Sequence, residues 1–241
     1  MVEASNKELI TGPFGYSKAS SRYEYDASTP RDKYDRSCIL LDWVGDKKRV
    51  LEVGCSTGYM SREMKKRGCS VTGIEVDPVA AERAREYCES VHVLDLNAPD
   101  WAAGFSQREF DVVLLADVLE HLVMPDLILN QLTRFLAPDG TLVISLPNVV
   151  HCVTRLKILF GRFDYEAWGT LDHTHLRFFT PKTARALIEG AGYRIARSHP
   201  VIGGTMAGHA RPAWRWLAHL APGLFAYQML FEAKKSNSSE K

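Results

Sequence analysis

Small residues and an acid recur at fixed distances in the first half of the chain. Gly54 and Gly58 enclose a run of three small residues, and Glu75 follows 21 residues after Gly54. A glycine turn lets the backbone approach a ligand closely, and an acid about 20 residues further on can accept hydrogen bonds from two ribose hydroxyls. The spacing therefore predicts a site for a ligand that carries ribose. A strand-to-helix turn that merely needs glycine is the plain alternative.

The glycine pattern disfavours two common nucleotide sites. The dinucleotide fingerprint G-x-G-x-x-G has a middle glycine that lets the backbone meet a pyrophosphate, and Ser56 stands in its place. A phosphate-binding loop of the Walker type would continue into a lysine, whereas Gly58 is followed by Tyr59 and Met60. An NAD-dependent oxidoreductase and a P-loop enzyme are therefore disfavoured.

A second group of chemically able residues follows the apolar run 110–116. Asp117, Glu120 and His121 stand at positions i, i+3 and i+4, which share one face of a helical turn. Two carboxylates and one imidazole can hold a divalent metal such as Mg²⁺, and His175 from a later segment could complete the set. His121 and His175 are also candidate catalytic bases, because histidine accepts a proton near neutral pH. A capping or supporting role for His121 at a helix start is the alternative.

Apolar runs and helical segments alternate around these residues. Short apolar runs predict strands at 50–53, 70–75, 91–94, 110–116, 141–146, 193–196 and 226–233. Helices are expected at 31–43, 59–67, 79–90, 124–135 and 180–189. The alternation predicts an α/β fold with a doubly wound parallel sheet, whose strands deliver the glycine turn, Glu75 and Asp117 to one crevice.

Composition restricts the class of protein. The 241 residues suggest one α/β domain, and 46% hydrophobic and 24% charged residues are ordinary for a globular protein. The net charge is +1 and no basic stripe is present, so nucleic-acid binding is not expected. The five cysteines are widely spaced without a C-x-x-C pair, which favours a reducing cytoplasm. Neither a signal peptide nor a transmembrane segment is expected.

Four segments are expected along the chain. Residues 1–30 form an N-terminal arm, either loosely packed or acting as a flap, and 31–235 form the main domain. An insert at 148–178 is expected to be substrate lid and wall, and 236–241 a disordered tail.

The insert and a later helix each allow two interpretations. Val149, Val153, Leu156 and Phe160 stand at helical spacing, and we expect this stripe to pack against the domain. The cations beside it are expected in solvent, or could attract a phosphorylated or carboxylated substrate. An amphipathic helix around 211–220 is expected to dock on the core, with dimer or membrane-surface contact as the alternative. The chain is expected to be a monomer or a homodimer.

Five motifs occur in order and resemble a known family. They are VLEVGCSTGYMS, VTGIEVDP, FDVVLLADVLEHL, LAPDGTLVISLPN and LRFFTPKTARALIEGAGY, within residues 35 to 195. Together they resemble class I S-adenosylmethionine (SAM)-dependent methyltransferases of the ubiquinone-methyltransferase-like branch. The run from Ser145 to Thr180 is similar to bacterial methyltransferases of polysaccharide and secondary-metabolite pathways. The resemblance implies a seven-stranded sheet whose last strand is antiparallel.

The resemblance also implies roles for residues. In that family the glycine turn accepts the methionine part of SAM, and an acid after the third strand accepts from the adenine amino group. A capping role for Asp95 is the alternative. The implied cofactor-binding residues are Glu52, Gly54, Cys55, Ser56, Gly58, Glu75, Val76, Asp95, Leu96, Asn97, Ala116 and Asp117. The candidate metal set Asp117, Glu120, His121 and His175 resembles the E-x-x-E-H site of ubiquinone-pathway and small-RNA 2′-O-methyltransferases, with Asp117 in place of the first glutamate.

The resemblance implies SAM-dependent O-methylation of a small molecule. The expected acceptor is a hydroxyl of a sugar, glycoside or secondary metabolite, which could also carry phosphate. N-methylation of an amino sugar or amine is one alternative, since it needs less help from a base. A non-catalytic SAM-binding accessory protein is another, and the acids Glu52, Glu75 and Asp95 argue against it.

Overall fold

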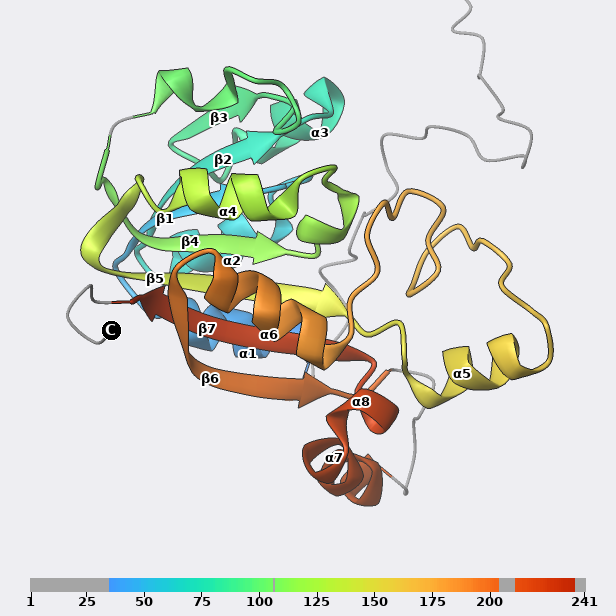
Figure 1. The fold of residues 1–241 in the computed structure, drawn as a ribbon. Coiled ribbons are helices and arrows are strands. Elements are labelled where there is room, and N and C mark those ends of the chain that lie inside the picture. The colour runs from blue at the N-terminus through green and yellow to red at the C-terminus, as the bar shows by residue number, and fades with distance from the viewer. Residues whose placement is uncertain (1–34, 106, 204–210, 237–241) are drawn as a thin grey trace, which may run out of the picture.

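A seven-stranded sheet runs through the molecule in the order β3-β2-β1-β4-β5-β7-β6 (Figure 1). This computed structural model describes residues 35–105, 107–203 and 211–236. The expected N-terminal arm (1–30) and nearly all of the expected tail (236–241) lie outside these ranges. The strands are β1 Arg49–Val53, β2 Ser70–Glu75, β3 Ser90–Val93, β4 Phe110–Ala116, β5 Leu136–Pro147, β6 Tyr193–Val201 and β7 Gln228–Lys235. β7 pairs antiparallel with β5 and β6, and the other pairs are parallel, which confirms the predicted topology.

Helices cover both faces of the sheet (Figure 1). They are α1 Arg36–Val44, α2 Tyr59–Lys66, α3 Pro78–Ala84, α4 Pro125–Leu132, α5 Cys152–Leu159, α6 Pro181–Gly190, α7 Arg211–Leu220 and α8 Pro222–Phe225. Two short 3₁₀ turns are η1 Trp101–Gly104 and η2 Leu119–His121. Residues of α1, α2 and α3 pack on one face, and residues of α4 and α6 on the other. β4, covered on both faces, is therefore apolar from Val112 to Ala116 rather than alternating.

Three elements differ most from the sequence prediction, and one of them is β6, which runs to Val201 rather than ending near 196. β5 begins at Leu136 rather than near 141, because Leu136 pairs with Phe110 before a register shift. α3 ends at Ala84 rather than near 90, and the chain turns back on hydrogen bonds from the Tyr87 and Cys88 amides to the Ala84 carbonyl. The predicted N-cap of α3 is confirmed, since the Asp77 carboxylate accepts from the Val79 amide at 2.8 Å.

The insert after β5 extends beyond the carboxyl ends of β4 and β5 (Figure 1). Between α5 and α6 the chain has no regular element apart from one bridge between Glu166 and Asp172. The predicted packing of its apolar stripe is wrong: Val153, Leu156 and Phe160 are exposed, and Thr154 is the buried residue of α5. Within the described ranges, no helix has the length and apolar character needed to cross a bilayer.

Candidate functional site

A cavity of about 1340 Å³ opens at the carboxyl edge of the sheet. Its lining includes residues at or just beyond the ends of five strands, namely Gly54, Glu75, Asp95, Ala116 and Pro147. Pockets for one small ligand measure about 300–1,000 Å³, so this cavity has room for a cofactor and an acceptor together. It lies at the crevice that the doubly wound topology predicts.

The glycine turn is fixed against β2. The amides of Gly54 and Cys55 both donate to the Ile74 carbonyl, at 2.8 and 3.0 Å. Gly54 has φ +71°, and a Cβ there would lie 2.8 Å from Val118 Cγ2. A side chain at this position would therefore displace both the turn and the segment that follows β4.

Gly58 serves packing rather than the cavity lining. Its φ is +79°, and a Cβ would lie 2.9 Å from the Ala84 Cα of α3. The cavity lining does not include Gly58. The close approach of α3 to the start of α2 therefore accounts for the second glycine of the motif.

Glu75 is held by three backbone amides. Its Oε2 accepts from the Ser56 amide at 2.8 Å, and its Oε1 accepts from the Val76 and Asp77 amides at 2.8 and 2.9 Å. Ser56 adopts φ +49°, an uncommon conformation for a residue with a side chain. The carboxylate at the end of β2 thus also fixes the glycine turn, so the predicted ribose acceptor is oriented before any ligand binds.

Asp95 lies on the cavity wall and also caps the turn after β3. It lines the cavity, and its Oδ1 accepts from the backbone amide and the side-chain amide of Asn97, at 2.9 and 3.0 Å. Asn97 Oδ1 in turn accepts from the Val123 amide at 3.0 Å. The turn after β3 is therefore tied to the segment after η2. The remaining predicted cofactor residues on the cavity wall are Ser56, Val76, Leu96, Asn97 and Asp117.

Glu52 and Cys55 lie away from the cavity. Leu51 and Val53 pack on the α4 side of the sheet, so the pleat turns Glu52 toward the opposite face. There its carboxyl accepts from the Ser61 hydroxyl of α2 and is almost completely buried. Burial raises the pKa of Glu52 to about 8. The structure thus gives Glu52 a place between β1 and α2 and buries the Cys55 side chain, in contrast to their predicted contact with the cofactor.

Asp117 is separated from the residues it was expected to join. It adopts φ +56° before η2, so the helical i, i+3, i+4 relation does not begin at this residue. Its carboxylate pairs with Arg36 and accepts from Ser145 Oγ at 2.5 Å and from Gln228 Nε2 at 3.0 and 3.1 Å. Asp117 therefore lines the cavity as the centre of a network that joins α1, β4, β5 and β7.

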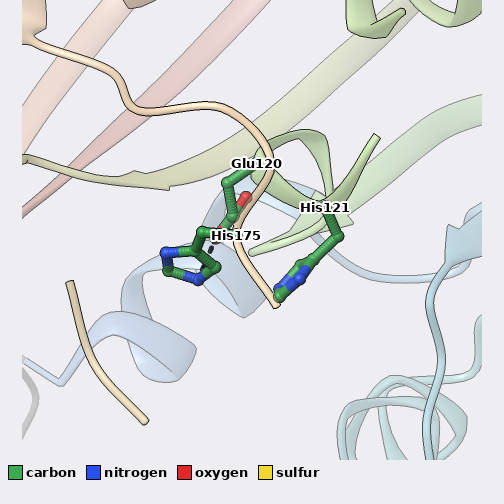
Figure 2. A group of neighbouring side chains, drawn as sticks. All are labelled: Glu120, His121 and His175. Carbon is green, nitrogen blue, oxygen red and sulfur yellow. Dashed lines mark ion pairs between the residues drawn. The ribbon is translucent and has the colours of Figure 1, made fainter. Parts of the chain in front are cut away.

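Glu120, His121 and His175 come together on the cavity wall (Figure 2). His175 Nε2 lies 4.0 Å from Glu120 Oε1, and the two imidazole rings meet edge to face at 4.8 Å. The Glu120 carbonyl accepts from the Leu176 and Arg177 amides at 2.8 and 2.9 Å. These hydrogen bonds attach the end of the insert to η2. The histidine from the insert is thus brought to the motif that follows β4, as the sequence predicts.

The hydrogen bonds of the two histidines fix their tautomers. His175 Nδ1 lies 3.2 Å from the Thr170 carbonyl, and His121 Nδ1 lies 3.2 Å from the Thr174 carbonyl. A carbonyl only accepts, so each Nδ1 carries the proton and each Nε2 presents a lone pair. Each ring therefore carries its accepting nitrogen at Nε2.

Glu120 is a buried acid whose hydrogen-bonding capacity is unused. It is 1% exposed, and neither carboxyl oxygen has a hydrogen-bond partner among the described residues. Burial raises the pKa of Glu120 to about 8, and burial followed by the neighbouring His121 lowers the pKa of His175 to about 4. Near pH 7 the pair therefore consists of a protonated carboxyl and a neutral imidazole. Buried polar groups without partners cluster where a ligand completes the set.

The donor set of this cluster fits a divalent metal. One donor atom from each of Glu120, His121 and His175 lies within 4.8 Å of the others. One ion with bonds of about 2.1 Å spans ligands up to about 4.2 Å apart, so a small approach of the side chains would suffice. The histidines have the Nδ1–H···O=C bonds that commonly orient metal ligands. Asp117 is held outside this group by Arg36.

Several residues at the cavity were not found from the sequence. Arg36 precedes the first motif, and Gln228 enters because antiparallel β7 brings it opposite Pro147. Arg215 reaches the cavity from α7, whereas Trp168 belongs to the insert that was expected to form a wall of the site. No local spacing relates these residues to the glycine turn, so only the tertiary fold brings them to the site.

The chain was compared with families and with known proteins. Residues 24–198 match the family described as "Methyltransferase domain". A ubiquinone biosynthesis O-methyltransferase of Aeromonas salmonicida is 29% identical over 167 residues, which cover 65% of this chain and 70% of the relative.

Solved structures share the fold. A SAM-dependent methyltransferase from Archaeoglobus fulgidus aligns with a TM-score of 0.60 at 17% identity, over 83% of this chain and 92% of that one. The 1,6-didemethyltoxoflavin-N1-methyltransferase of Burkholderia thailandensis, solved with S-adenosylhomocysteine bound, aligns with a TM-score of 0.56 at 18% identity, over 83% and 76%.

Proposed function

The chain belongs to the class I SAM-dependent methyltransferases, and from this premise we propose that it methylates a hydroxyl oxygen of a small molecule. The observation that carries the proposal is the cluster of Glu120 and two histidines on the wall of the same cavity as Glu75 and Asp95. A hydroxyl must lose its proton during methyl transfer, and a neutral imidazole can accept it. The printed name of the curated relative, an O-methyltransferase, supports oxygen as the acceptor atom.

In the proposed mechanism the cofactor end of the cavity aligns the methyl donor. Glu75 would bind the two ribose hydroxyls, Asp95 and the Leu96 amide would hold the adenine, and the glycine turn would hold the methionine part. Methyl transfer is an in-line displacement, so most of the rate enhancement comes from alignment of donor and acceptor. The backbone amides that hold Glu75 and the turn supply this alignment without a large rearrangement.

The acceptor end handles the proton. The hydroxyl proton passes to a histidine Nε2, and His175 is the leading candidate because its Nε2 faces Glu120 Oε1 while the Thr170 carbonyl holds its Nδ1. Glu120, 4.0 Å away, stabilises the resulting imidazolium when its own carboxyl is ionised. Since the pKa of Glu120 is about 8, methyl transfer should become faster as the pH rises through that value.

A divalent metal is a second arrangement of the same residues. The unpartnered carboxyl of Glu120 favours it, and Glu120, His121 and His175 would hold the ion. A bound ion would lower the pKa of a coordinated hydroxyl. Metal analysis of the purified chain separates the two arrangements. The metal arrangement requires about one ion per chain, lost in His121→Ala but kept in His199→Ala, whose residue lies outside the cavity. Full activity in a metal-free sample would exclude it.

The acceptor itself is identified by a transfer assay. The purified chain is incubated with SAM labelled on its methyl carbon and with glycosides, hydroxylated aromatics and amino sugars. We expect label on oxygen, with sugar or glycoside hydroxyls the expected acceptors, and nuclear magnetic resonance distinguishes O-methyl from N-methyl carbon. Label found only on nitrogen would replace O-methylation by N-methylation. SAM binding without transfer to any acceptor would favour the accessory role.

A further inference from the structure

The insert exposes an unusual amount of apolar surface. In α5 the side chains of Leu156, Leu159 and Phe160 are 54%, 75% and 76% exposed. A helix of this length normally turns such residues toward a core. Here the helix buries Thr154 instead, so its apolar side chains face outward in the described part of the chain.

The apolar surface continues past α5. We call the exposed side chains of α5 and of the segment up to residue 168 the apolar platform; they are Val153, Leu156, Ile158, Leu159, Phe160, Phe163, Tyr165 and Trp168. Proteins that stay monomeric in water rarely expose large contiguous apolar patches. Figure 1 shows this part of the chain projecting from the sheet, away from the layers of the fold.

The platform borders the cavity and the C-terminal helices. Trp168, 78% exposed, also lines the cavity. Arg155 Nη2 of α5 donates to the Gly223 carbonyl of α8 at 3.4 Å, which places α5 beside the α7–α8 pair. On α7, Trp216 and Leu220 are each 63% exposed. Apolar side chains thus surround one side of the cavity mouth.

Charge is distributed unevenly around this surface. Segments 149–168 and 212–227 contain four Lys and Arg against two Asp and Glu, whereas the rest of the chain has 26 against 27. The two acids face cations, with Asp164 3.5 Å from Arg162 and Glu166 paired with Lys157. Exposed pairs of this kind are weak, so an anionic ligand can compete for the cations.

We propose that the apolar platform docks on the surface of an anionic lipid bilayer. Exposed aliphatic and aromatic side chains beside Lys and Arg are the composition of segments that lie in the membrane interface. A second copy of this chain would place like charges opposite each other across a two-fold axis, which disfavours self-association through the same face. The cavity mouth beside Trp168 then opens toward the headgroups.

The docking bears on the acceptor. If the chain methylates a hydroxyl as proposed above, an acceptor that reaches the cavity from the bilayer is an amphiphile, with its hydroxyl in the cavity and its apolar part toward the platform. The docking itself does not depend on methyl transfer, and it is measured without SAM or acceptor.

Vesicle sedimentation of the purified full chain tests the proposal. Vesicles of phosphatidylcholine mixed with phosphatidylglycerol are compared with vesicles of phosphatidylcholine alone. We expect binding to the mixed vesicles, weaker binding at high salt, and at least about ten-fold weaker binding by the double variant Leu159→Ser and Phe160→Ser, since two large apolar side chains are removed. The matched control is Leu127→Ser on α4, a leucine 45% exposed outside the platform.

Three results would overturn the proposal. The first is no sedimentation with anionic vesicles. The second is equal binding by the double variant and the wild type. The third is a wild-type dimer in analytical ultracentrifugation that the double variant converts to monomer, which would assign the platform to a second copy. Calorimetry with SAM on the double variant keeps the outcomes distinct, because unchanged SAM affinity shows that the cofactor end is intact whether or not vesicles bind.

Discussion

The two ends of the cavity are built in different ways. At the cofactor end, both carboxylate oxygens of Glu75 and the Oδ1 of Asp95 accept from nearby backbone or side-chain amides, at 2.8 to 3.0 Å. At the acceptor end, Glu120 is buried with both oxygens unpartnered among the described residues. A site that always binds the same cofactor can be fixed in advance by its own backbone, whereas groups that handle a substrate keep hydrogen-bonding capacity for it. The difference predicts that changes at one end leave the other intact.

The largest effect is expected at the acceptor end. His175→Ala removes the proposed proton acceptor, and we expect turnover to fall about 10²–10³-fold, the range for loss of a general base. Steady-state kinetics with saturating SAM measures it. The matched control is His199→Ala on β6, which lies outside the cavity lining. Unchanged turnover in His175→Ala would move this residue to a packing role.

The next effect is expected at the cofactor end. Glu75→Ala removes the acceptor of the ribose hydroxyls and the anchor of the Ser56 amide, so we expect the dissociation constant for SAM to rise about 100-fold, as for loss of two charge-assisted hydrogen bonds. Titration calorimetry gives the value. Glu82→Ala is the control, because this carboxylate is exposed on α3 and pairs with Arg85. A change smaller than about three-fold would exclude Glu75 as a ribose ligand.

A third substitution tests whether Glu52 acts in the stability of the fold rather than in SAM binding. Burial raises the folded-state pKa of Glu52 to about 8 from its usual 4.5, so the free energy of unfolding should fall as the pH rises from about 4.5 to about 8. Glu52→Gln cannot titrate, so its stability relative to that of the wild type should increase by about 3 to 4 kcal/mol between pH 5 and pH 8. Urea denaturation at both pH values measures this. Unchanged SAM affinity is also expected, and a large loss of affinity would return Glu52 to the cofactor site.

The smallest effect is expected at Asp95. In Asp95→Asn the side-chain carbonyl can still accept from the Asn97 amide, so the turn should persist while the charge is lost. We expect SAM to bind about three- to ten-fold more weakly, because a single hydrogen-bond acceptor loses strength. Asp100→Asn, at the start of η1 without a side-chain capping bond, is the control. Equal affinity for the variant and the wild type would leave Asp95 with the capping role alone.

The sequence predicted the cofactor end better than the acceptor end for physical reasons. The positions of Ser56, Glu75 and Asp95 follow from strand lengths and the doubly wound order, which local patterns indicate. Glu52 was misplaced although the signal was present, because strand alternation puts it on the opposite face from Leu51 and Val53. Asp117 was misplaced because its positive φ breaks the helical spacing, and no residue pattern near it indicates that conformation.

The insert shows a different limit of the sequence. An apolar stripe at helical spacing in α5 indicates that one face of the helix becomes buried. The stripe does not identify the partner against which that face packs. In the described structure the covering group is not supplied by the rest of the domain, since Leu156 and Phe160 remain exposed. Residue spacing also could not predict that His175 lies beside Glu120. This contact depends on the path of the insert, whose end is attached to η2.

The separation of the two ends is tested most directly by titrating SAM into His175→Ala and the wild type side by side. The account predicts dissociation constants equal within about two-fold, although turnover in the variant is lost. A His175→Ala protein that binds SAM ten-fold or more weakly would contradict it, because the two ends of the cavity would then be one coupled site.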